Sequence, residues 1–329
     1  MRVLVTGGAG YIGSCTAARL AKAGFDPVVF DNLSTGHADN VRWGPLVVGD
    51  LQDSELLRRT VREHDIEAAV HFAASAYVGE SMQQPGKYFR NNVAGSLALL
   101  EALQAEDVGT IVFSSTCATY GLPEHVPIDE THPQQPVNPY GESKLFVEKA
   151  LRWYGAIHGT RWLALRYFNV AGADTEHALG ERHEPETHLI PLVIEAALGR
   201  RSCIEVLGTD YATADGTAVR DYVHVVDLAE AHVAALRLLL AGGESRALNL
   251  GTGRGFSVRE VIDAVRSLSG RDVPVREAPR RPGDPPVLVA DATLAGTILG
   301  WQPRAAGLEQ IVTSALAWHT VQPRIHARD

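Results

Sequence analysis

Short apolar runs alternate with longer amphipathic stretches along the first half of the chain. The runs are rich in β-branched residues, which is typical of strands buried on both faces. We predict strands over 2–6, 27–30, 46–49, 68–72, 110–115 and 162–168. The stretches between them repeat apolar residues at helical spacing and predict helices over 11–23, 54–64, 85–106 and 139–158. This alternation predicts an α/β fold, with a doubly wound parallel sheet covered by helices on both faces.

The second half of the chain is less regular. Residues 170–217 and 274–308 are rich in glycine, proline and charge, which predicts a smaller lobe of loops and short elements. Residues 222–240 read as a strand end and a long helix, and 247–250 as a strand; both are able to return to the first sheet. The predicted division is a first domain over 1–169, completed by about 218–250, and a smaller, interleaved C-terminal substrate lobe over 170–217 and 251–329.

Glycines recur directly after the first predicted strand. Gly8, Gly10 and Gly13 fit the spacing G-x-G-x-x-G, and Gly7 extends the pattern to G-x-x-G-x-x-G. Glycine permits a tight turn and lets backbone N–H groups approach a pyrophosphate, which the positive end of the next helix attracts. Because the motif lies between a strand and a helix, it predicts a dinucleotide site of the Rossmann type. The expected cofactor contacts within it are Gly7, Gly10, Tyr11, Ile12 and Gly13.

Asp31 ends the second predicted strand, where the acidic residue that binds a ribose is expected. Its carboxylate can accept hydrogen bonds from both ribose hydroxyls, but it would repel a 2′-phosphate. Residues 32–37 contain no arginine or lysine that would neutralise such a phosphate. The sequence therefore predicts NAD rather than NADP as the cofactor.

Composition and charge narrow the class of protein. The chain has 329 residues, of which 45% are hydrophobic and 21% charged, as in an ordinary globular protein. A net charge of −9 argues against a nucleic-acid or anionic-membrane partner. The three cysteines have no metal-ligand spacing and indicate reduced thiols. The N-terminal apolar run stops at Gly7, too short for a signal peptide, so we expect a cytoplasmic protein.

The histidines do not indicate a metal site. Three of them, His177, His183 and His188, lie in an irregular acidic stretch, but their sequence shows no ligand-like constellation. Metal sites need three or four ligands brought to one point. We therefore predict no metal.

A tyrosine and a lysine stand four residues apart in the predicted helix 139–158. Tyr140 and Lys144 consequently share one helix face. An unperturbed tyrosine ionises near pH 10, so its use as a base at pH 7 costs about 4 kcal/mol. One nearby cation lowers a pKa by ~1–3 units, which makes the lysine alone marginal and the positive charge of oxidised nicotinamide its natural supplement. Thr116 follows the strand 110–115 and can hydrogen-bond the same substrate oxygen. These three residues predict acid–base catalysis at a substrate hydroxyl.

Several further polar and aromatic residues follow predicted strands. Ligands of doubly wound sheets bind beyond the carboxyl ends of the strands, so we take these residues as a group. They are Asp50, His71-Phe-Ala73, Ser114-Ser-Thr116 and Tyr167-Phe-Asn169.

The chain resembles the extended short-chain dehydrogenase/reductase family, and within it the sugar-nucleotide 4-epimerases, over almost its whole length. The later blocks are the specific ones, because the early blocks are shared with sister enzymes. The matching blocks are the glycine loop, Asp31-Asn32, Gly49-Asp50-Leu51, His71-Phe-Ala-Ala74, Val78-Gly-Glu-Ser81, Asn91-Asn92-Val93, Tyr140-Gly-Glu-Ser-Lys144, Leu165-Arg-Tyr-Phe-Asn169, Gly216-Thr-Ala-Val-Arg-Asp-Tyr-Val-His224 and Arg280-Arg-Pro-Gly-Asp284.

The resemblance implies NAD-dependent epimerisation at C4 of a UDP-hexose, from UDP-galactose to UDP-glucose and back, through a transient 4-keto sugar and enzyme-bound NADH. It also implies a homodimer that pairs the helices 85–106 and 139–158. The implied catalytic residues are Tyr140, Lys144 and Thr116. The implied cofactor contacts are the glycine-loop residues given above with Asp31, Asn32, Asp50, Leu51, Phe72, Ala73, Asn91, Ser114, Tyr140, Lys144 and Tyr167. The implied substrate contacts are Thr116, Tyr140, Phe168, Asn169, His188, Leu189, Arg220, Arg281 and Asp284.

The chain departs from the family pattern at four positions. Thr116 replaces a serine but keeps the hydroxyl, and His188 stands where some members have asparagine. Ala76 stands where some members have a lysine near the cofactor diphosphate, so a weaker hold on the cofactor is expected. Leu288 is neither the large tyrosine nor the small residue that the family associates with N-acetyl sugars, and it favours unacetylated hexoses.

We weigh three alternatives to a UDP-hexose 4-epimerase against the sequence. Related dehydratases use an Asp-Glu pair after the threonine, whereas Cys117-Ala118 follows here, so dehydration is unfavoured. A 4-epimerase of a UDP-pentose, a UDP-uronate or a UDP-N-acetylhexosamine would use the same chemistry in a different pocket. A catalytically inactive NAD-binding sensor is the remote alternative, and the retention of Tyr140, Lys144 and Thr116 counts against it.

Overall fold

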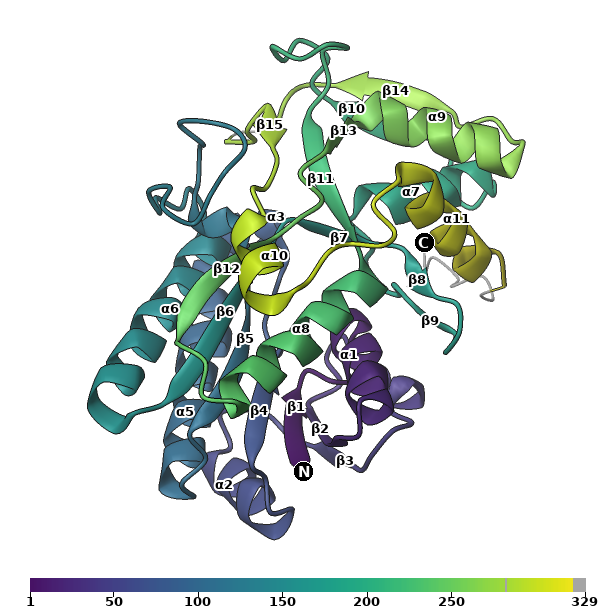
Figure 1. Ribbon diagram of the computed structural model, residues 1–329. Coiled ribbons are helices and arrows are strands. Elements are labelled where there is room, and N and C mark those ends of the chain that lie inside the picture. The colour runs from purple at the N-terminus through teal and green to yellow at the C-terminus, as the bar shows by residue number, and fades with distance from the viewer. Residues whose placement is uncertain (282, 322–329) are drawn as a thin grey trace.

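Seven parallel strands form the main sheet of the computed structural model, which describes residues 1–281 and 283–321 (Figure 1). The strand order is β12-β6-β5-β4-β1-β2-β3, so the sheet grows outward in both directions from β1. The strands are β1 Arg2–Thr6, β2 Asp26–Asp31, β3 Leu46–Val48, β4 Ala68–His71, β5 Thr110–Thr116, β6 Arg161–Tyr167 and β12 Arg246–Leu250. This order confirms the predicted doubly wound sheet of the Rossmann type.

Helices cover both faces of this sheet, because side chains alternate along each strand. Val3 and Val5 pack on one face with the helices α1 and α8, and Leu4 packs on the other with α2, α5 and α6. The helices are α1 Tyr11–Lys22, α2 Ser54–Glu63, α5 Gly95–Ala105, α6 Pro139–His158 and α8 Val225–Leu240. Within residues 1–281 and 283–321, no helix has the length and apolarity needed to cross a bilayer.

The helix predicted over 85–106 is interrupted. It consists of α4 Pro85–Tyr88, a π-helical segment Phe89–Ala94, and α5. The wide segment carries Asn92, whose side-chain amide donates to the carbonyl oxygen of Ser75 at 3.0 Å and to the hydroxyl of Ser143 at 2.9 Å. Such segments often occur at functional sites, because they turn one side chain away from the regular helical position. The short helix α3 Val78–Gln83, which precedes α4, was not predicted.

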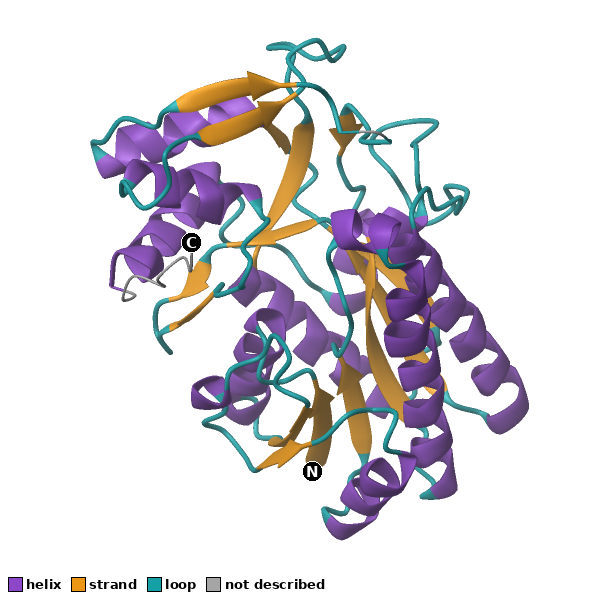
Figure 2. Ribbon diagram, turned by 180° about the vertical axis from the view of Figure 1, so that it is seen from behind, coloured by secondary structure: helices purple, strands orange, loops and turns teal. Residues whose placement is uncertain are grey.

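A smaller lobe lies beyond the carboxyl ends of the main strands (Figures 1 and 2). In it β11 pairs with β7, β13 and β15, β10 pairs with β14, and β8 pairs with β9. Its strands are β7 Asn169–Ala171, β8 Ala173–Asp174, β9 Leu179–Gly180, β10 Ile204–Leu207, β11 Val219–His224, β13 Gly255–Ser257, β14 Val275–Ala278 and β15 Val287–Leu288. Its helices are α7 Leu189–Ala197, α9 Val258–Ser269 and α11 Leu308–Val321, while α10 Thr293–Leu299 packs near β12.

The chain returns to the main sheet only in part. Helix α8 packs on β5 and β6, and β12 pairs with β6, as the sequence indicates. The strand before α8 does not return: β11 pairs within the smaller lobe, which corrects that part of the expectation. Its partners β7, β13 and β15 are two or three residues long and carry too little pattern to be recognised in the sequence. The domain boundaries themselves stay a prediction.

Candidate active site

The glycine loop forms a cradle with no room for side chains. A Cβ on Gly13 would lie 2.2 Å from the carbonyl oxygen of Gly7, and one on Gly7 would lie 2.6 Å from the backbone nitrogen of Ala73. Gly7 also has a φ of +72°, which L side chains rarely adopt. Helix α1 starts after Gly10 with no side-chain cap and no acidic residue in its first turn. Its first N–H groups therefore remain available to an anion, and the cradle fits a pyrophosphate.

The side chains of Tyr11 and Ile12 serve packing rather than the cradle. The Tyr11 hydroxyl donates to the carbonyl oxygen of Gly172 at 2.6 Å, which ties the start of α1 to the smaller lobe. Ile12 packs against the buried residues beside it. A cofactor contact at these two positions is therefore assigned to the backbone.

Asp31 is held in place at the end of β2. Its Oδ2 accepts from the backbone N–H of Ala9 at 3.0 Å and its Oδ1 from that of Leu33 at 2.8 Å. Burial raises the pKa of Asp31, against these two hydrogen bonds, which lower it. Each carboxylate oxygen keeps a further lone pair for a ribose hydroxyl. The neighbouring Asn32 amide donates to Asp50 Oδ2 at 2.9 Å, so a second carboxylate lies near the end of β2.

We expect NAD to bind at least ~100-fold more tightly than NADP. A 2′-phosphate placed beside Asp31 would meet a like charge, and such juxtaposition costs several kcal/mol. Calorimetric titration of the cofactor-free protein with each dinucleotide measures the ratio directly. Equal or tighter binding of NADP would show that Asp31 does not discriminate against a phosphate on the ribose 2′-oxygen.

Tyr140, Lys144 and Thr116 converge between α6 and β5. The Asn138 side chain caps α6 by accepting from Gly141 N–H at 2.8 Å, which fixes Tyr140 in the first turn. Lys144 is buried, and its Nζ donates to the carbonyl oxygen of Ser114 at 2.8 Å. The Thr116 hydroxyl oxygen accepts from Ala118 N–H at 3.1 Å. Thr116 also hydrogen-bonds Tyr140, and this bond lowers the tyrosine pKa.

The electrostatics of this group differ from the expectation. Burial raises the pKa of Tyr140 above its ordinary value, and burial lowers the pKa of Lys144 to about 7. Among the described residues, the hydrogen bonds of Lys144 do not include one to Tyr140. The lysine therefore does not by itself activate the tyrosine, because burial disfavours the charged form of both groups. Activation at neutral pH needs a further positive charge at the site.

The buried lysine gives a testable pH dependence. Between pH ~7 and its unperturbed value near 10.4, the unfolded chain holds a proton that folded Lys144 lacks. The free energy of unfolding therefore rises with pH in this window, by up to ~1.4 kcal/mol per unit from this group. We expect Lys144→Met to stabilise the cofactor-free protein most at pH 7 and progressively less towards pH 10.

Urea unfolding of wild type and variant at pH 7, 8 and 9 measures this difference. Lys149→Met serves as the control, because Lys149 is exposed on the same helix. A Lys144→Met difference that stays constant across these pH values would rule out a depressed lysine pKa.

Buried polar groups that the sequence analysis did not single out position the catalytic helix. Arg166 on β6 forms a buried ion pair with Glu148 on α6, with Nε–Oε1 at 2.9 Å and Nη2–Oε2 at 2.5 Å. Ser115 also donates to Glu148, at 2.6 Å. Separating such a pair would leave a buried charge without a partner, which costs several kcal/mol. The pair therefore holds α6 and β6 in one relative position. The sequence signals were a glutamate in the middle of a helix that needs an apolar face and an arginine within a strand predicted to be buried.

Most of the expected nicotinamide-side residues gather around the ends of β4, β5 and β6. Ser114 and Tyr167 share a hydrogen bond, and burial raises the pKa of Tyr167 to about 12. The Asn91 amide donates to Asn92 Oδ1 at 3.0 Å. Phe72 instead packs against His232, with ring centroids 4.7 Å apart and planes tilted by 44°, and Leu51 is buried in the core beside α5. Ala73 lies against the glycine cradle through its backbone.

The expected substrate residues fall into two groups. Arg220 on β11 pairs with Asp284, with Nη2–Oδ1 at 2.5 Å, and stands opposite Leu288 in the β11–β15 register. Leu288 packs against a small apolar cluster that includes Cys117 and Phe168, which places this group near the Thr116 end of β5. Asn169 pairs with Tyr222 at the start of β7, and Arg281 is exposed near Asp284.

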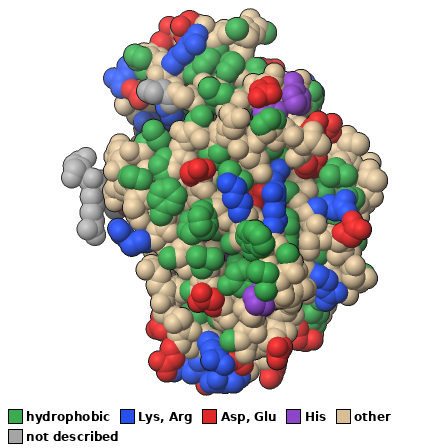
Figure 3. Space-filling view, turned by 90° about the vertical axis from the view of Figure 1, so that its left-hand side faces the viewer, with side chains coloured by type: hydrophobic (Ala, Val, Ile, Leu, Met, Phe, Trp, Pro, Cys, Tyr) green, Lys and Arg blue, Asp and Glu red, His purple; other side chains and the backbone are tan. Residues whose placement is uncertain are grey.

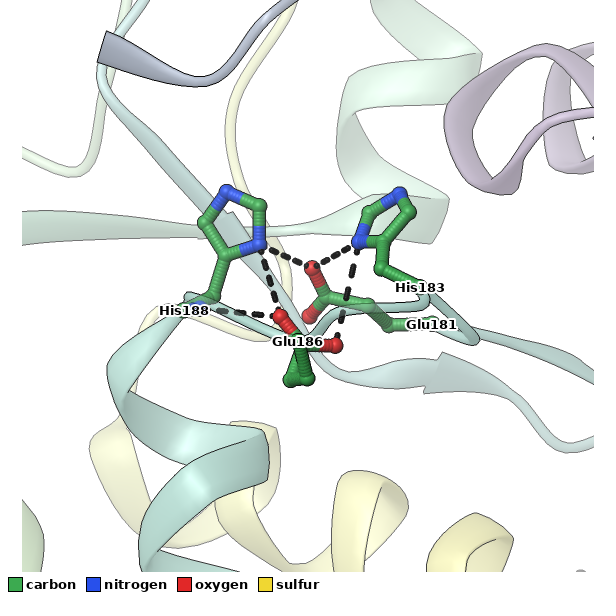
Figure 4. A group of neighbouring side chains, drawn as sticks. All are labelled: Glu181, His183, Glu186 and His188. Atoms are coloured by element: carbon green, nitrogen blue, oxygen red, sulfur yellow. Dashed lines mark hydrogen bonds and ion pairs between the residues drawn. The ribbon is translucent and has the colours of Figure 1, made fainter. Parts of the chain in front are cut away.

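His188 and Leu189 stand at the start of α7. Leu189 packs partly on the apolar core of the smaller lobe. His188 belongs to a cluster with Glu181, His183 and Glu186, whose ligand-type atoms all lie within 4.8 Å of one another (Figure 4). Burial lowers the pKa of His183, but Glu181 and Glu186 outweigh it and raise that pKa to about 9. The expectation that this stretch holds no ligand-like constellation is therefore wrong, because the loop folds back and brings all four side chains together.

The chain is similar in sequence and in structure to proteins whose family is known. A family model described as the NAD dependent epimerase/dehydratase family matches residues 3–251. A protein of Rhizobium meliloti named UDP-glucose 4-epimerase is 54% identical, with 97% of each chain covered. The crystal structure of UDP-glucose 4-epimerase from Brucella ovis in complex with NAD is 52% identical, covers 96% of this chain and 97% of its own, and has a TM-score of 0.94. The Bifidobacterium longum enzyme of the same name, in complex with NAD+ and UDP, is 38% identical, covers 98% and 99%, and has a TM-score of 0.93.

Proposed function

Because the chain belongs to the NAD-dependent epimerase/dehydratase family, we propose that it catalyses the reversible C4 epimerisation of UDP-galactose to UDP-glucose. The observation that carries this proposal is the placement of Tyr140 and Thr116 beside a cradle that fits a dinucleotide. Close relatives named UDP-glucose 4-epimerase, two of them solved with NAD, support the cofactor and the reaction.

The chain's own residues supply the proton transfer. Tyr140 accepts the proton of the sugar 4-hydroxyl, and Thr116 holds that hydroxyl oxygen in line with it. NAD, when bound, supplies the acceptor that takes hydride from C4 and later returns it. Since the configuration at C4 inverts, the 4-keto sugar must present its other face before hydride returns. Tyr140 then gives the proton back to the same oxygen.

The UDP group has to stay anchored while the sugar turns. Arg220 suits this role, because a guanidinium fork binds a phosphate through two parallel hydrogen bonds. In the structure its Nη2 contacts Asp284, so substrate binding would exchange this carboxylate for a phosphate or share the arginine between them. Arg281, three residues before Asp284 in the chain, is exposed and is proposed as a second anchor.

The electrostatics assign a role to the cofactor's charge. Since burial raises the pKa of Tyr140 and lowers that of Lys144, the site without its ligands keeps the tyrosine protonated at neutral pH. A positive charge beside the tyrosine lowers its pKa, and so does the return of Lys144 to its charged form. An oxidised nicotinamide beside Tyr140 would supply such a positive charge and favour the ionised form of the tyrosine.

The experiment is to give the purified protein UDP-galactose with no added cofactor and to look for UDP-glucose by chromatography. Conversion to an equilibrium mixture is expected, because the cofactor is regenerated in each cycle. The same assay with UDP-N-acetylglucosamine, a UDP-pentose and a UDP-uronate tests the neighbouring 4-epimerase activities. We expect the N-acetylated sugar to be turned over more slowly, since Leu288, which packs against the apolar cluster that includes Phe168, is not the small residue that suits an N-acetyl group. A failure with every nucleotide sugar, with NAD bound, would favour the NAD-sensing alternative.

We further propose a homodimer that buries one face of α6. Phe146, Trp153 and Ile157 lie on this face at helical spacing and are 51%, 67% and 66% exposed. Phe89, in the adjoining π-helical segment, is also exposed. Figure 3 shows hydrophobic side chains gathered over the middle of the side on which α6 lies. Contiguous exposed apolar patches of this kind mark protein–protein contacts.

Trp153→Glu is expected to convert a dimer to a monomer. A charge in the middle of an apolar contact loses its hydration without gaining a partner, which weakens association strongly. Light scattering at micromolar protein concentration measures the molar mass in solution. Leu268→Glu, on the separate helix α9, is the control and should leave the dimer intact. A monomeric wild type would overturn this proposal.

We also propose that the protein works in the cytoplasm. Its three cysteines, Cys15, Cys117 and Cys203, are all unpaired, and the first two are buried. Unpaired thiols are typical of a reducing compartment. Cell fractionation with an antibody to the protein tests this, and recovery outside the cytoplasmic fraction would contradict it.

A further inference from the structure

Two carboxylates hold one side of the His188 imidazole (Figure 4). The Nδ1 atom of His188 lies 2.7 Å from Glu181 Oε1 and 3.1 Å from Glu186 Oε1. Glu186 Oε1 also accepts from the backbone N–H of His188 at 2.8 Å, so one carboxylate fixes both the main chain and the ring. Because an ionised carboxylate only accepts hydrogen bonds, His188 Nδ1 must carry a proton.

The other side of the His188 ring is open. Its Nε2 atom points away from both carboxylates (Figure 4), and 42% of the side chain is exposed, against 5% for Glu181. The hydrogen bonds formed within residues 1–281 and 283–321 engage the Nδ1 atom and the backbone of His188, and none engages Nε2. This second nitrogen is therefore free to meet a ligand.

Aromatic contacts connect His188 to the catalytic tyrosine. The ring of Tyr77, which precedes α3, lies beside the His188 ring with centroids 6.5 Å apart. The carbonyl oxygen of Tyr77 accepts from the Tyr88 hydroxyl at 2.6 Å. The Tyr88 ring in turn meets the Tyr140 ring edge-on, with centroids 6.5 Å apart. This run of contacts places His188 at the border of the active site.

We propose that Glu181 and Glu186 are positioning residues, which hold His188 as a charged imidazolium whose Nε2–H donates to an acceptor oxygen of the bound nucleotide sugar. The inference rests on the proposed function for the identity of this ligand. Asparagine, which stands at this position in some members of the family, has a neutral amide that both donates and accepts. An imidazolium only donates, and its hydrogen bonds are roughly twice as strong as neutral ones. The position therefore favours an acceptor, either on the phosphates or on the sugar.

The charges around His188 support its protonated form. Burial lowers the pKa of His188, but Glu181 and Glu186 outweigh burial and raise that pKa well above its ordinary value. The same carboxylates face His183 Nδ1, at 3.2 Å for Glu181 Oε1 and 3.7 Å for Glu186 Oε2. Two imidazolium groups thus balance two carboxylates, and the cluster needs no further charge.

The other titratable groups that face the cluster keep one charge state near neutral pH. Tyr77 and Tyr11 face Glu181 and Glu186, and burial together with these carboxylates raises both tyrosine pKa values, that of Tyr77 to about 12. His319 on α11 also faces the two glutamates, and burial lowers its pKa. Between pH 7 and 8.5 the two tyrosines and His319 are therefore neutral, and a change of charge in this range comes from the histidines of the cluster.

The first test measures the charge of His188 in the substrate-free protein. NMR titration of protein labelled with ¹³C-histidine, with the signal assigned by its loss in His188→Asn, is expected to give a pKa well above the ordinary value of about 6.5. Glu186→Gln is expected to lower this pKa by ~1 unit or more, because it removes one of two facing carboxylates. Glu184→Gln, at an exposed position outside the cluster, is the control and should leave the pKa unchanged. A wild-type pKa at or below the ordinary value would overturn the proposal.

The second test measures the contact by calorimetric titration of the NAD-bound protein. His188→Ala is expected to weaken the binding of UDP-glucose about 10-fold or more, because a hydrogen bond from a charged donor is lost. If the binding of UDP weakens equally, the acceptor is a phosphate oxygen; if UDP binds as it does to wild type, the acceptor is on the sugar. Unchanged binding of UDP-glucose by His188→Ala would contradict the proposal.

The third test separates positioning from a merely structural role. In Glu186→Gln the KM for UDP-galactose is expected to rise between pH 7 and 8.5, by up to ~10-fold per pH unit, because His188 loses its proton in this range. The effect should fall on KM rather than on kcat. The double variant Glu186→Gln/His188→Asn should lose this pH dependence, because asparagine does not titrate. Persistence of the pH dependence in the double variant would show that His188 is not its source.

The failure of this inference is distinguishable from the failure of the proposed function. A wild type that converts no nucleotide sugar would overturn the proposed function, while the calorimetric test, which needs no turnover, would still decide the role of His188. Normal turnover with unchanged KM and unchanged binding in His188→Ala would overturn this inference alone.

Discussion

Tyr140→Phe is expected to lower kcat by about 10²- to 10⁴-fold and to leave the bound cofactor in place. General acid–base catalysis by a positioned side chain contributes a factor of this size, equivalent to roughly 3–5 kcal/mol of barrier. Of the three proposed catalytic residues, Tyr140 is the one proposed to exchange a proton with the substrate, because Lys144 donates to the carbonyl oxygen of Ser114. Phenylalanine keeps the ring, so the fold should be unchanged.

The measurement pairs the rate of UDP-galactose conversion with the NAD released per chain on denaturation. Tyr154→Phe is the matched control, because it makes the same change about four turns further along α6. It should convert substrate as wild type does. More than a tenth of wild-type activity in Tyr140→Phe, with NAD retained, would mean that another residue is the base.

Gly13→Ala is expected to weaken NAD binding by at least ~100-fold and to remove the activity with it. The added Cβ would lie 2.2 Å from the carbonyl oxygen of Gly7 and 2.9 Å from the Cα of Gly8, inside the radii of both atoms. Helix α1 must then move away from β1, which would displace the N–H groups proposed to face the pyrophosphate. Calorimetric titration with NAD gives the change in affinity.

Gly109→Ala provides the comparison, because a Cβ at Gly109 would meet nothing within 4 Å. It should bind NAD with the affinity of wild type. Wild-type affinity in Gly13→Ala would contradict a pyrophosphate site at the glycine cradle.

The sequence predicts the main sheet well, because its signals there are local. Helix α6 runs over Pro139–His158 as expected, since a proline begins it and Gly159, in the left-handed region, ends it. The helix over 85–106 was wrong in its middle, where the π-helical segment inserts an extra residue that leaves the apolar pattern almost unchanged. Strands of two or three residues, such as β8 and β15, fix their place only through pairing.

The candidate site shows the same limit. The types and spacings of Tyr140, Lys144 and Asp31 pointed to their chemistry, but the direction of a pKa depends on burial, which the sequence does not show. The Glu148–Arg166 pair joins residues 18 apart and required the fold to be seen. The cluster of Glu181, His183, Glu186 and His188 did leave a signal, since two glutamates and two histidines occur within eight residues. Only the turn of that loop makes them converge.

In the proposed reaction, one bound NAD takes hydride from C4 and returns it to the same carbon. The most direct test gives the protein UDP-galactose deuterated at C4, in ordinary water and with no added cofactor, and analyses the product by mass spectrometry and NMR. We predict UDP-glucose that keeps its deuterium at C4, because the hydride never exchanges with solvent. UDP-glucose that has lost the label to water would contradict the account, because the C4 hydrogen would then have left as a proton.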